Sequence, residues 1–282
     1  MANNIEPLIT VHKKLLAFVD IEVISLMHGK IRTFPGLKNL ALFFFAKSTK
    51  TYRAINQLCG NGIGYGEDAT ILARSLLENL INFSYIVNPK DKKEQEHRAE
   101  LFANWLILDL KQRIDSKETA KSTKEQLVKY FNEYESLGID YEKMRELHQD
   151  ECAKINKCDG KKKTSSWSGR SLGSMAKEVE KSFPTTKLFS TYYNEAYRLH
   201  SKIAHPDPGG SNSYIEKREP EGGLVIYAIP NSHSIREALC SSFEYYSKLL
   251  LLISDVFDLN LTKINDIANE YLAAVKEAYN DD

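Results

Sequence analysis

The chain has 282 residues, which is enough for one large domain or two modest ones. Hydrophobic residues make up 42% of the sequence and charged residues 27%, as in ordinary globular proteins. Because 38 Lys and Arg balance 38 Asp and Glu, no overall field attracts the chain to nucleic acid or to a membrane, and any phosphate-binding site has to be a local patch.

The cysteines and the hydrophobic runs of the sequence indicate the cellular compartment in which the protein is found. Cys59, Cys152, Cys158 and Cys240 are scattered, which fits a reducing compartment better than a disulfide framework. The first residues, MANNIEPLITVHKK, lack the basic and then apolar pattern of a signal peptide. The most hydrophobic stretches, NLALFFFA and LLLLIS, are far shorter than the roughly 20 residues that a membrane-spanning helix needs. We therefore expect a cytoplasmic protein without a membrane partner.

The apolar periodicity predicts an all-α fold, a multi-helix bundle. In chain order, the helices are expected at 4–28, 38–59, 67–87, 91–115, 122–136, 140–157, 171–182, 185–205, 232–257 and 262–280. Pro35 and Gly36 open the second helix, and GNGIGYG (60–66) separates it from the third. Pro184 suits the first turn of the helix expected at 185–205.

Only two short regions depart from this helical pattern. GLVIYAI (223–229) has the β-branched and aromatic content of a strand, and with IEKREP (215–220) it predicts at most one small β-hairpin near 214–229. KCDGKKKTSSWSGRS (157–171) is polar and basic, so we expect an exposed, flexible loop that Trp167 could anchor. We expect one helical domain over 1–282 with its core at 66–258, in which this loop could separate an N-terminal from a C-terminal helical half.

The helix expected at 185–205 carries a polar stripe. At about 100° per residue, one face carries Asn194, Arg198, Ser201 and His205. His200 instead projects among the apolar residues. Arg198 and His205 are almost two turns apart, and an aligned cation and imidazole can hold a phosphate and move a proton. Because Pro206 ends the helix, the helix dipole would favour protonated His205. The alternative is a solvated helix face followed by a turn.

A second polar stripe lies on the helix expected at 67–87. Arg74, Glu78 and Asn82 follow one another at four-residue spacing, with large apolar residues beside them. We therefore expect these side chains to line a cleft or seam, with Arg74 paired to Glu78. Two roles remain open for the pair, namely a buried ion pair that sets helix register or a support for a nearby site.

Other motifs carry less information. Glu94 and His97 have the spacing used in di-iron bundles, but the required second copy of the motif is missing from the sequence. The spacing of His148, Cys152 and Cys158 matches no common structural zinc site. The sequence lacks a P-loop, a dinucleotide fingerprint and a nucleophile-elbow serine. We therefore predict neither a metal nor another cofactor.

Three blocks of the sequence are informative in combination and in their order along the chain. They are ARSLLENLINFSYIVNPKDKKEQEHRAELF, WSGRSLGSMAKEV and YYNEAYRLHSKIAHPDPGGS. They predict a helix with R-x3-E, a Trp-led helix and a helix that ends in S-x3-H-P. The combination resembles a poorly characterised bacterial family of helical proteins of unknown function, over roughly residues 66–258.

The last block also resembles the R-x4-6-H signature of the HEPN superfamily (higher eukaryotes and prokaryotes nucleotide-binding domains). These compact helical domains are common among toxins, abortive-infection proteins and CRISPR-linked ribonucleases. In the superfamily the pair lies at a dimer seam and cuts RNA without a metal. The signature arginine corresponds to Arg198 and the histidine to His205. Here Leu199 follows the arginine in place of the usual polar residue, and the spacing is at the long end of the range.

The resemblance implies an HEPN-like core and a metal-independent endoribonuclease or toxin-type effector in bacterial anti-phage defence. His205 would act as general base or acid and Arg198 would stabilise phosphoryl charge, leaving a 2′,3′-cyclic phosphate. Asn194 and Ser201 would position the phosphate or the imidazole, with Arg74 and Glu78 in support. The implied partners are RNA, a second copy of the chain in a homodimer, and a protein encoded in a defence operon.

Two alternatives belong to other functional classes. The first is a non-catalytic helical sensor or scaffold of a defence complex, in which the polar stripes are binding seams or structural ion pairs. The second is a pocket for a nucleotide or another small molecule between the two polar stripes.

Overall fold

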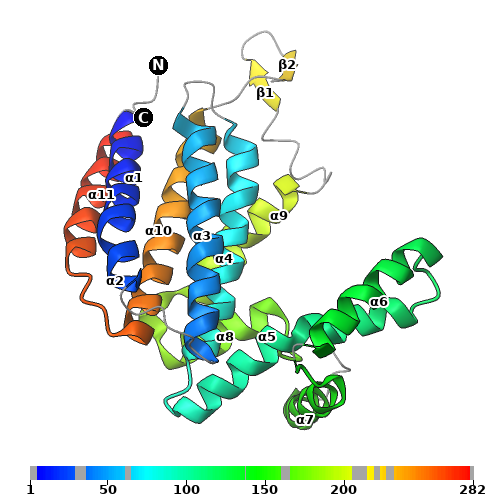
Figure 1. Cartoon of the computed structure of the whole chain (residues 1–282). Coiled ribbons are helices and arrows are strands. Elements are labelled where there is room, and N and C mark those ends of the chain that lie inside the picture. The colour runs from blue at the N-terminus through cyan, green and yellow to red at the C-terminus, as the bar shows by residue number, and fades with distance from the viewer. Residues whose placement is uncertain are drawn as a thin grey trace. The chain divides into compact units, whose positions relative to one another are not determined.

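The computed structural model describes residues 5–28, 36–60, 65–136, 138–159, 166–204, 215–218, 223–226 and 232–279. Apart from one hairpin, the elements within these ranges are helical, which confirms the all-α class (Figure 1). The chain divides into two compact units, unit 1 with Met1–Val87 and Ala176–Asp282, and unit 2 with Asn88–Met175. The expected single domain over 1–282 with its core at 66–258 stays a prediction.

Most helices lie close to the ranges expected from the sequence, but the helix expected at 185–205 is divided into a 3-10 turn, a π-helix and a short α-helix. Unit 1 contains α1 (Glu6–Phe18), the π-helix η1 (Val19–Val23), α2 (Ile24–His28), α3 (Leu37–Gly60), α4 (Gly66–Val87), the 3-10 turn η2 (Pro184–Thr186), the π-helix η3 (Leu188–Tyr197), α9 (Arg198–Ala204), α10 (Ser232–Phe257) and α11 (Lys263–Tyr279). Unit 2 contains α5 (Lys92–Asp115), α6 (Lys121–Ser136) and α7 (Tyr141–Asp159). The helix α8 (Leu172–Ser182) includes residues of both units.

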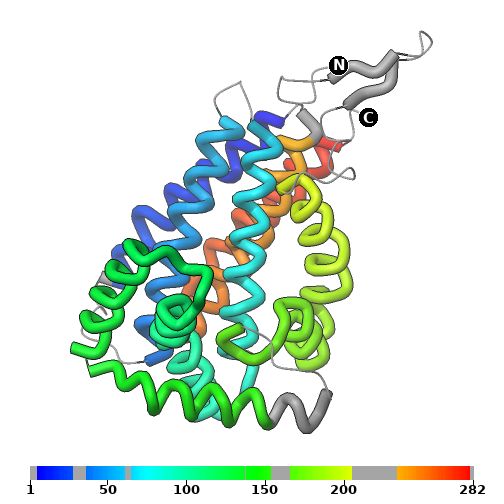
Figure 2. Tube along the Cα trace, turned by 90° about the vertical axis from the view of Figure 1, so that its right-hand side faces the viewer, coloured from blue at the N-terminus to red at the C-terminus, as the bar shows by residue number. Residues whose placement is uncertain are grey.

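The core of unit 1 forms where α3, α4 and α10 pack against one another, with α1 against α11 (Figure 2). Aromatic rings fill it: the ring centroids of Tyr52 and Tyr246 are 4.4 Å apart, and those of Phe44 and Phe83 are 5.2 Å apart. All four side chains are buried. Since aromatic side chains bury about 150–250 Å² each, this cluster is a main source of hydrophobic stabilisation for the unit.

His12 on α1 is a buried polar member of this core. Its ring is 0% exposed, it stacks on Tyr52 at 5.0 Å between centroids, and its Nε2 donates a hydrogen bond to the Leu239 carbonyl oxygen at 3.0 Å. Burial lowers the pKa of His12 to about 3, against the smaller opposing effect of the hydrogen bond to Leu239. This histidine is therefore neutral in the folded protein at neutral pH.

Gly66 allows the first turn of α4 to approach α10 closely. A Cβ atom built on Gly66 would lie 2.6 Å from both the Ser234 Cβ and the Ile235 main-chain nitrogen. Beside this contact, Ser234 Oγ donates to Glu67 Oε1 at 2.9 Å. The segment GNGIGYG (60–66) was expected to separate two helices, and its last glycine is in addition a packing residue.

In unit 2, α5 packs against α6 and against α7. The loop expected at 157–171 begins later than predicted, because residues 157–159 belong to α7. Residues 160–165 lie outside the described part of the chain, and residues 166–171 are described again and lead into α8. Trp167 is buried, with its ring centroid 5.1 Å from that of Phe102 in an edge-to-face arrangement. The aromatic contact fixes this end of the segment.

The one sheet in the described residues is a two-stranded antiparallel hairpin. Its strands are β1 (Ile215–Arg218) and β2 (Gly223–Ile226), with Ile215 opposite Ile226. This hairpin lies within the range of 214–229 that was expected from the sequence.

Candidate functional site

The segment that carries Arg198 is not one continuous α-helix. Lys187 has a left-handed backbone (φ 49°, ψ 30°), a π-helix follows over Leu188–Tyr197, and α9 begins at Arg198. Because a π-helix closes its hydrogen bonds from i to i+5, its turns contain more residues than α-helical turns. A projection at about 100° per residue is therefore wrong before Arg198. Asn194 lies in the π-helix, so it does not keep the register with Arg198 and Ser201 that this projection assigned to it. π-Helical turns occur often at functional sites.

Glu180 on α8 satisfies the first main-chain N–H groups of η3. Its Oε2 accepts hydrogen bonds from the nitrogens of Phe189 at 2.6 Å and Ser190 at 2.9 Å. Desolvation acts to raise the pKa of the Glu180 carboxyl, but the hydrogen bonds from Ser190 and Phe189 outweigh it, so the pKa is lowered. The charged carboxylate thus caps the π-helix.

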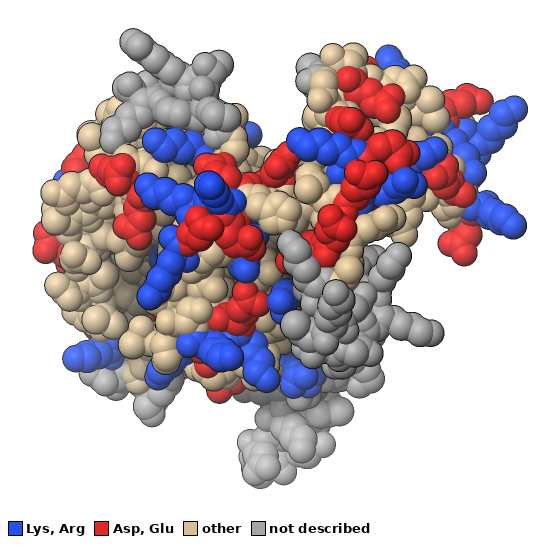
Figure 3. All heavy atoms as spheres, turned by 90° about the horizontal axis from the view of Figure 1, so that it is seen from below, with Lys and Arg blue, Asp and Glu red and all other residues tan. Residues whose placement is uncertain are grey.

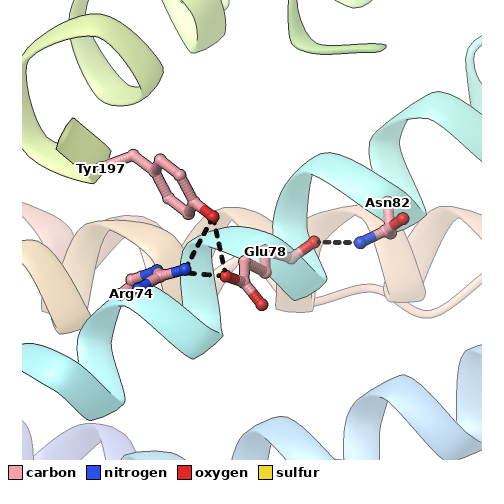
Figure 4. Close-up of polar contacts among 4 residues, drawn as sticks. All are labelled: Arg74, Glu78, Asn82 and Tyr197. Atoms are coloured by element: carbon pink, nitrogen blue, oxygen red, sulfur yellow. Dashed lines mark hydrogen bonds and ion pairs between the residues drawn. The ribbon is translucent and has the colours of Figure 1, made fainter. Parts of the chain in front are cut away.

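At the other end of η3, Tyr197 joins the polar stripe of α4 (Figure 4). Arg74 Nε donates to Glu78 Oε1 at 3.2 Å, and Arg74 Nη2 donates to Tyr197 Oη at 3.0 Å. Tyr197 Oη in turn donates to the same Glu78 Oε1 at 3.1 Å. These three side chains, here called the Arg74 cluster, form a closed ring of hydrogen bonds.

The Arg74 cluster is partly shielded from water. The side chains of Arg74 and Glu78 are 21% and 38% exposed, and the Arg74 guanidinium also lies over the Tyr197 ring, 4.7 Å from its centroid. Burial and the nearby Glu78 raise the pKa of Tyr197, although Arg74 opposes them. The expected ion pair between Arg74 and Glu78 is therefore present. Its third member, Tyr197, was not identified from the sequence.

Stacked aromatic rings extend the Arg74 cluster along η3. The ring centroids of Tyr197 and Tyr193 are 5.2 Å apart, and those of Tyr193 and Phe189 are 5.8 Å apart, with nearly parallel planes in both pairs. Figure 2 shows the yellow-green segment of η3 and α9 alongside the cyan α4. The stacking lies within η3, and the hydrogen bonds and the cation–π contact of Tyr197 with Arg74 and Glu78 attach η3 to α4.

A second polar group attaches η3 to α10. Tyr192 Oη donates to Glu244 Oε2 at 2.7 Å, while Lys248 donates to Tyr192 Oη and lies over its ring, 4.3 Å from the centroid. Tyr271 on α11 donates to the Cys240 carbonyl oxygen at 3.2 Å and lies 3.4 Å from Glu244 Oε1. Desolvation lowers the pKa of Lys248, against the opposing charge of Glu244. The sequence pattern gave no sign of this group, because its members are far apart in the chain.

The residues of the expected stripe occupy different environments. Arg198 is exposed, and its side chain has no ion pair or hydrogen bond within the described residues. Asn194 and Ser201 are half-buried. His200 is fully buried with its Nε2 3.2 Å from Glu237 Oε1, which confirms its expected place on the core side. His205 lies outside the described residues.

The two residues with di-iron spacing have other partners. Glu94 Oε1 accepts from Arg98 Nε at 3.1 Å, and His97 Nε2 lies 3.8 Å from Glu151 Oε2. Within the described ranges, no group of three or more His, Cys, Asp and Glu side chains is arranged to hold a metal ion.

On the face shown in Figure 3, the acidic and basic side chains of the described residues lie intermixed. No large region of that face, as far as it is described, carries one charge sign. This agrees with the equal numbers of acidic and basic residues in the sequence. None of the described helices combines the length and the apolar character needed to cross a membrane. On that face, a phosphate contact would depend on individual cations rather than on a broad field.

Comparison with known proteins identifies one family. No curated protein and no solved structure matches the chain. The profile of DUF5677, a family of unknown function, matches residues 38–223, a range that includes the Arg74 cluster, Arg198 and His205. This confirms the expected membership in a helical family of unknown function, while the HEPN-like signature stays a prediction. The chain therefore belongs to the DUF5677 family.

Proposed function

We propose that the protein is an HEPN-like, metal-independent endoribonuclease that acts as a toxin-type effector in bacterial anti-phage defence. The observation that supports this most is the position of Arg198. Its guanidinium is exposed and forms no ion pair in the described part of the chain, so it is available for a phosphate group. The preceding residue, Tyr197, is held by Arg74 and Glu78, which limits the motion of the backbone at Arg198.

In the proposed reaction, His205 removes the proton of a ribose 2′-hydroxyl, and the 2′-oxygen attacks the adjacent phosphorus. The bond from phosphorus to the 5′-oxygen breaks, and that oxygen takes a proton from an imidazolium. Arg198 stabilises the negative charge that develops on the phosphoryl oxygens. Ser201, on α9 with Arg198, positions the phosphate or the imidazole, whereas the role expected for Asn194 is not kept in the proposal because Asn194 lies in η3, out of register with this face. The products are a 2′,3′-cyclic phosphate and a 5′-hydroxyl.

One arginine and one histidine form a sparse site, so the proposal includes a homodimer that brings two copies of the pair together. Arg74 and Glu78 have a supporting role in it, since their side chains already bind each other and Tyr197. The proposed partners are RNA, the second copy, and a protein of the same defence operon that controls the activity.

The test measures cleavage of end-labelled RNA in the presence of EDTA by the wild type, Arg198→Ala and His205→Ala. We expect cleavage by the wild type and a loss of at least about 100-fold in each variant, in the range of one general acid–base or electrostatic contribution. Lys202→Ala is the matched control, because Lys202 is another exposed cation on α9 and should be dispensable. Full activity in both site variants would overturn the proposal.

A non-catalytic sensor or scaffold is the second candidate, and the closed Arg74 cluster favours it. Arg74 and Glu78 satisfy each other and Tyr197 within the chain, as expected for a structural seam. This candidate predicts no RNA cleavage by the wild type. It also predicts a stable complex with a partner of the defence system that Arg74→Ala or Glu78→Ala disrupts.

A further inference from the structure

Unit 2 contains a groove between α5 and α7 that the proposed function does not use. Its volume is about 410 Å³, which is within the range of small-molecule sites. Its polar and aromatic lining includes Trp105, Lys111, Gln112, Arg145, His148 and Gln149, and the acidic Asp115, which pairs with Lys111, lines it as well. They combine an aromatic wall, two cations and two amides.

The aromatic wall is formed by Trp105 of α5 and His148 of α7. Their ring centroids are 4.9 Å apart and the planes are tilted by 43°. His148 is held in place by its Nε2, which donates to the Ser166 carbonyl oxygen at 2.9 Å. Trp105 is half-buried at the groove wall. An indole packed beside this held imidazole, at the wall of a groove, offers a stacking surface for a planar heterocycle.

The two cations can be recruited by an anionic ligand. Lys111 Nζ lies 3.1 Å from Asp115 Oδ1, and Arg145 Nη2 lies 2.7 Å from Glu142 Oε2. The side chains of Lys111 and Arg145 are 35% and 48% exposed. Because exposed ion pairs between neighbouring turns of a helix contribute little, either cation can exchange its carboxylate for a phosphate.

The amides of Gln112 and Gln149 add donors and acceptors to the same groove. Each carries a carbonyl oxygen and an NH2 group, which is the combination that pairs with the polar edge of a nucleobase. No side-chain hydrogen bond within the described residues occupies either amide. We propose that this groove binds a nucleotide, with the base stacked on Trp105, its edge read by the glutamines, and its phosphate held by Lys111 and Arg145.

The cysteine in the groove does not point to covalent chemistry. Cys152 Sγ lies 3.8 Å from His148 Nδ1 and 3.7 Å from His148 Nε2. Because the two distances are nearly equal, the sulfur is not aligned with one nitrogen lone pair, as a thiol that gives its proton to a base would be. The groove is therefore assigned a binding role, which is independent of Arg198 and His205.

The chain contains 2 Trp, so Trp167→Phe leaves Trp105 as the only indole. The experiment titrates this variant with AMP, GMP, CMP and UMP, with the corresponding nucleosides, and with a short single-stranded RNA, following Trp105 fluorescence and the heat of binding. We expect saturable quenching by nucleotides and weaker binding of nucleosides. Saturation by mononucleotides assigns the site to free nucleotides, whereas saturation by RNA alone assigns it to a nucleotide unit of a strand.

The same titration is repeated with Lys111→Ala and Arg145→Ala added. Removal of either cation should weaken nucleotide binding about tenfold or more, as expected for the loss of a charge-assisted hydrogen bond. Lys143→Ala is the matched control, because Lys143 is an exposed cation of α7 that pairs with Glu100 outside the groove. No binding of any nucleotide or RNA, or equal affinity in all these variants, would overturn the proposal.

Discussion

The buried His12 ring predicts how the stability of the protein depends on pH. Its pKa is about 3 in the folded state against 6.5 for an ordinary histidine, so the unfolded chain binds a proton that the folded chain does not. Stability from this group is therefore complete above pH 6.5 and declines as the pH falls from 6.5 toward 3. The loss is about 1 kcal/mol at pH 5.5 and about 3 kcal/mol at pH 4.5.

The assay compares the free energy of unfolding of the wild type and His12→Gln in urea at several pH values. The glutamine amide can donate to the Leu239 carbonyl as the imidazole does, but it does not titrate. We expect the variant to be less stable at neutral pH because it packs less well against Tyr52, and to lose less stability on acidification. If the free energy of unfolding of both proteins falls with the same slope between pH 6.5 and 4.5, the claim that His12 is neutral in the folded protein is refuted.

Three further predictions concern the elements around the site. Gly66→Ala should destabilise unit 1 by about 1–3 kcal/mol through overpacking against Ser234, whereas Gly60→Ala, whose Cβ would meet no atom of the described residues within 4 Å, should be close to neutral in urea unfolding. Tyr197→Phe should cost about 1–2 kcal/mol and reduce RNA cleavage, because both its hydroxyl bonds are lost; Tyr193→Phe keeps the stacking and those bonds and should change neither. Glu180→Gln should weaken the cap of η3, and because the carboxyl pKa is lowered, the wild-type advantage in thermal unfolding should be present at neutral pH and disappear as the pH falls through that pKa.

The parts of the fold that depend on local pattern could be predicted from the sequence. Apolar periodicity located the helices, and four-residue spacing predicted the pair of Arg74 and Glu78, because both are set within a few turns of one chain segment. The burial of His200 followed from the same periodicity, since α9 is an ordinary α-helix.

The π-helix η3 could not be predicted in this way. It coincides with contacts between distant parts of the chain, such as Arg74 with Tyr197, which are 123 residues apart, and Tyr192 with Glu244, which are 52 apart. Such tertiary contacts can override local propensity, and a projection at a fixed angle contains no information about them. For the same reason the sequence did not identify Tyr197 as part of the site, or Gly66 as a packing residue.

The central claim is that Arg198 and His205 cut RNA without a metal ion. The most direct measurement is mass spectrometry of the RNA ends produced in EDTA by the wild type, Arg198→Ala and His205→Ala. The account predicts 2′,3′-cyclic phosphate and 5′-hydroxyl ends from the wild type and no such ends above background from either variant. Cleavage that stops in EDTA, or the same ends at undiminished yield from both variants, would contradict it.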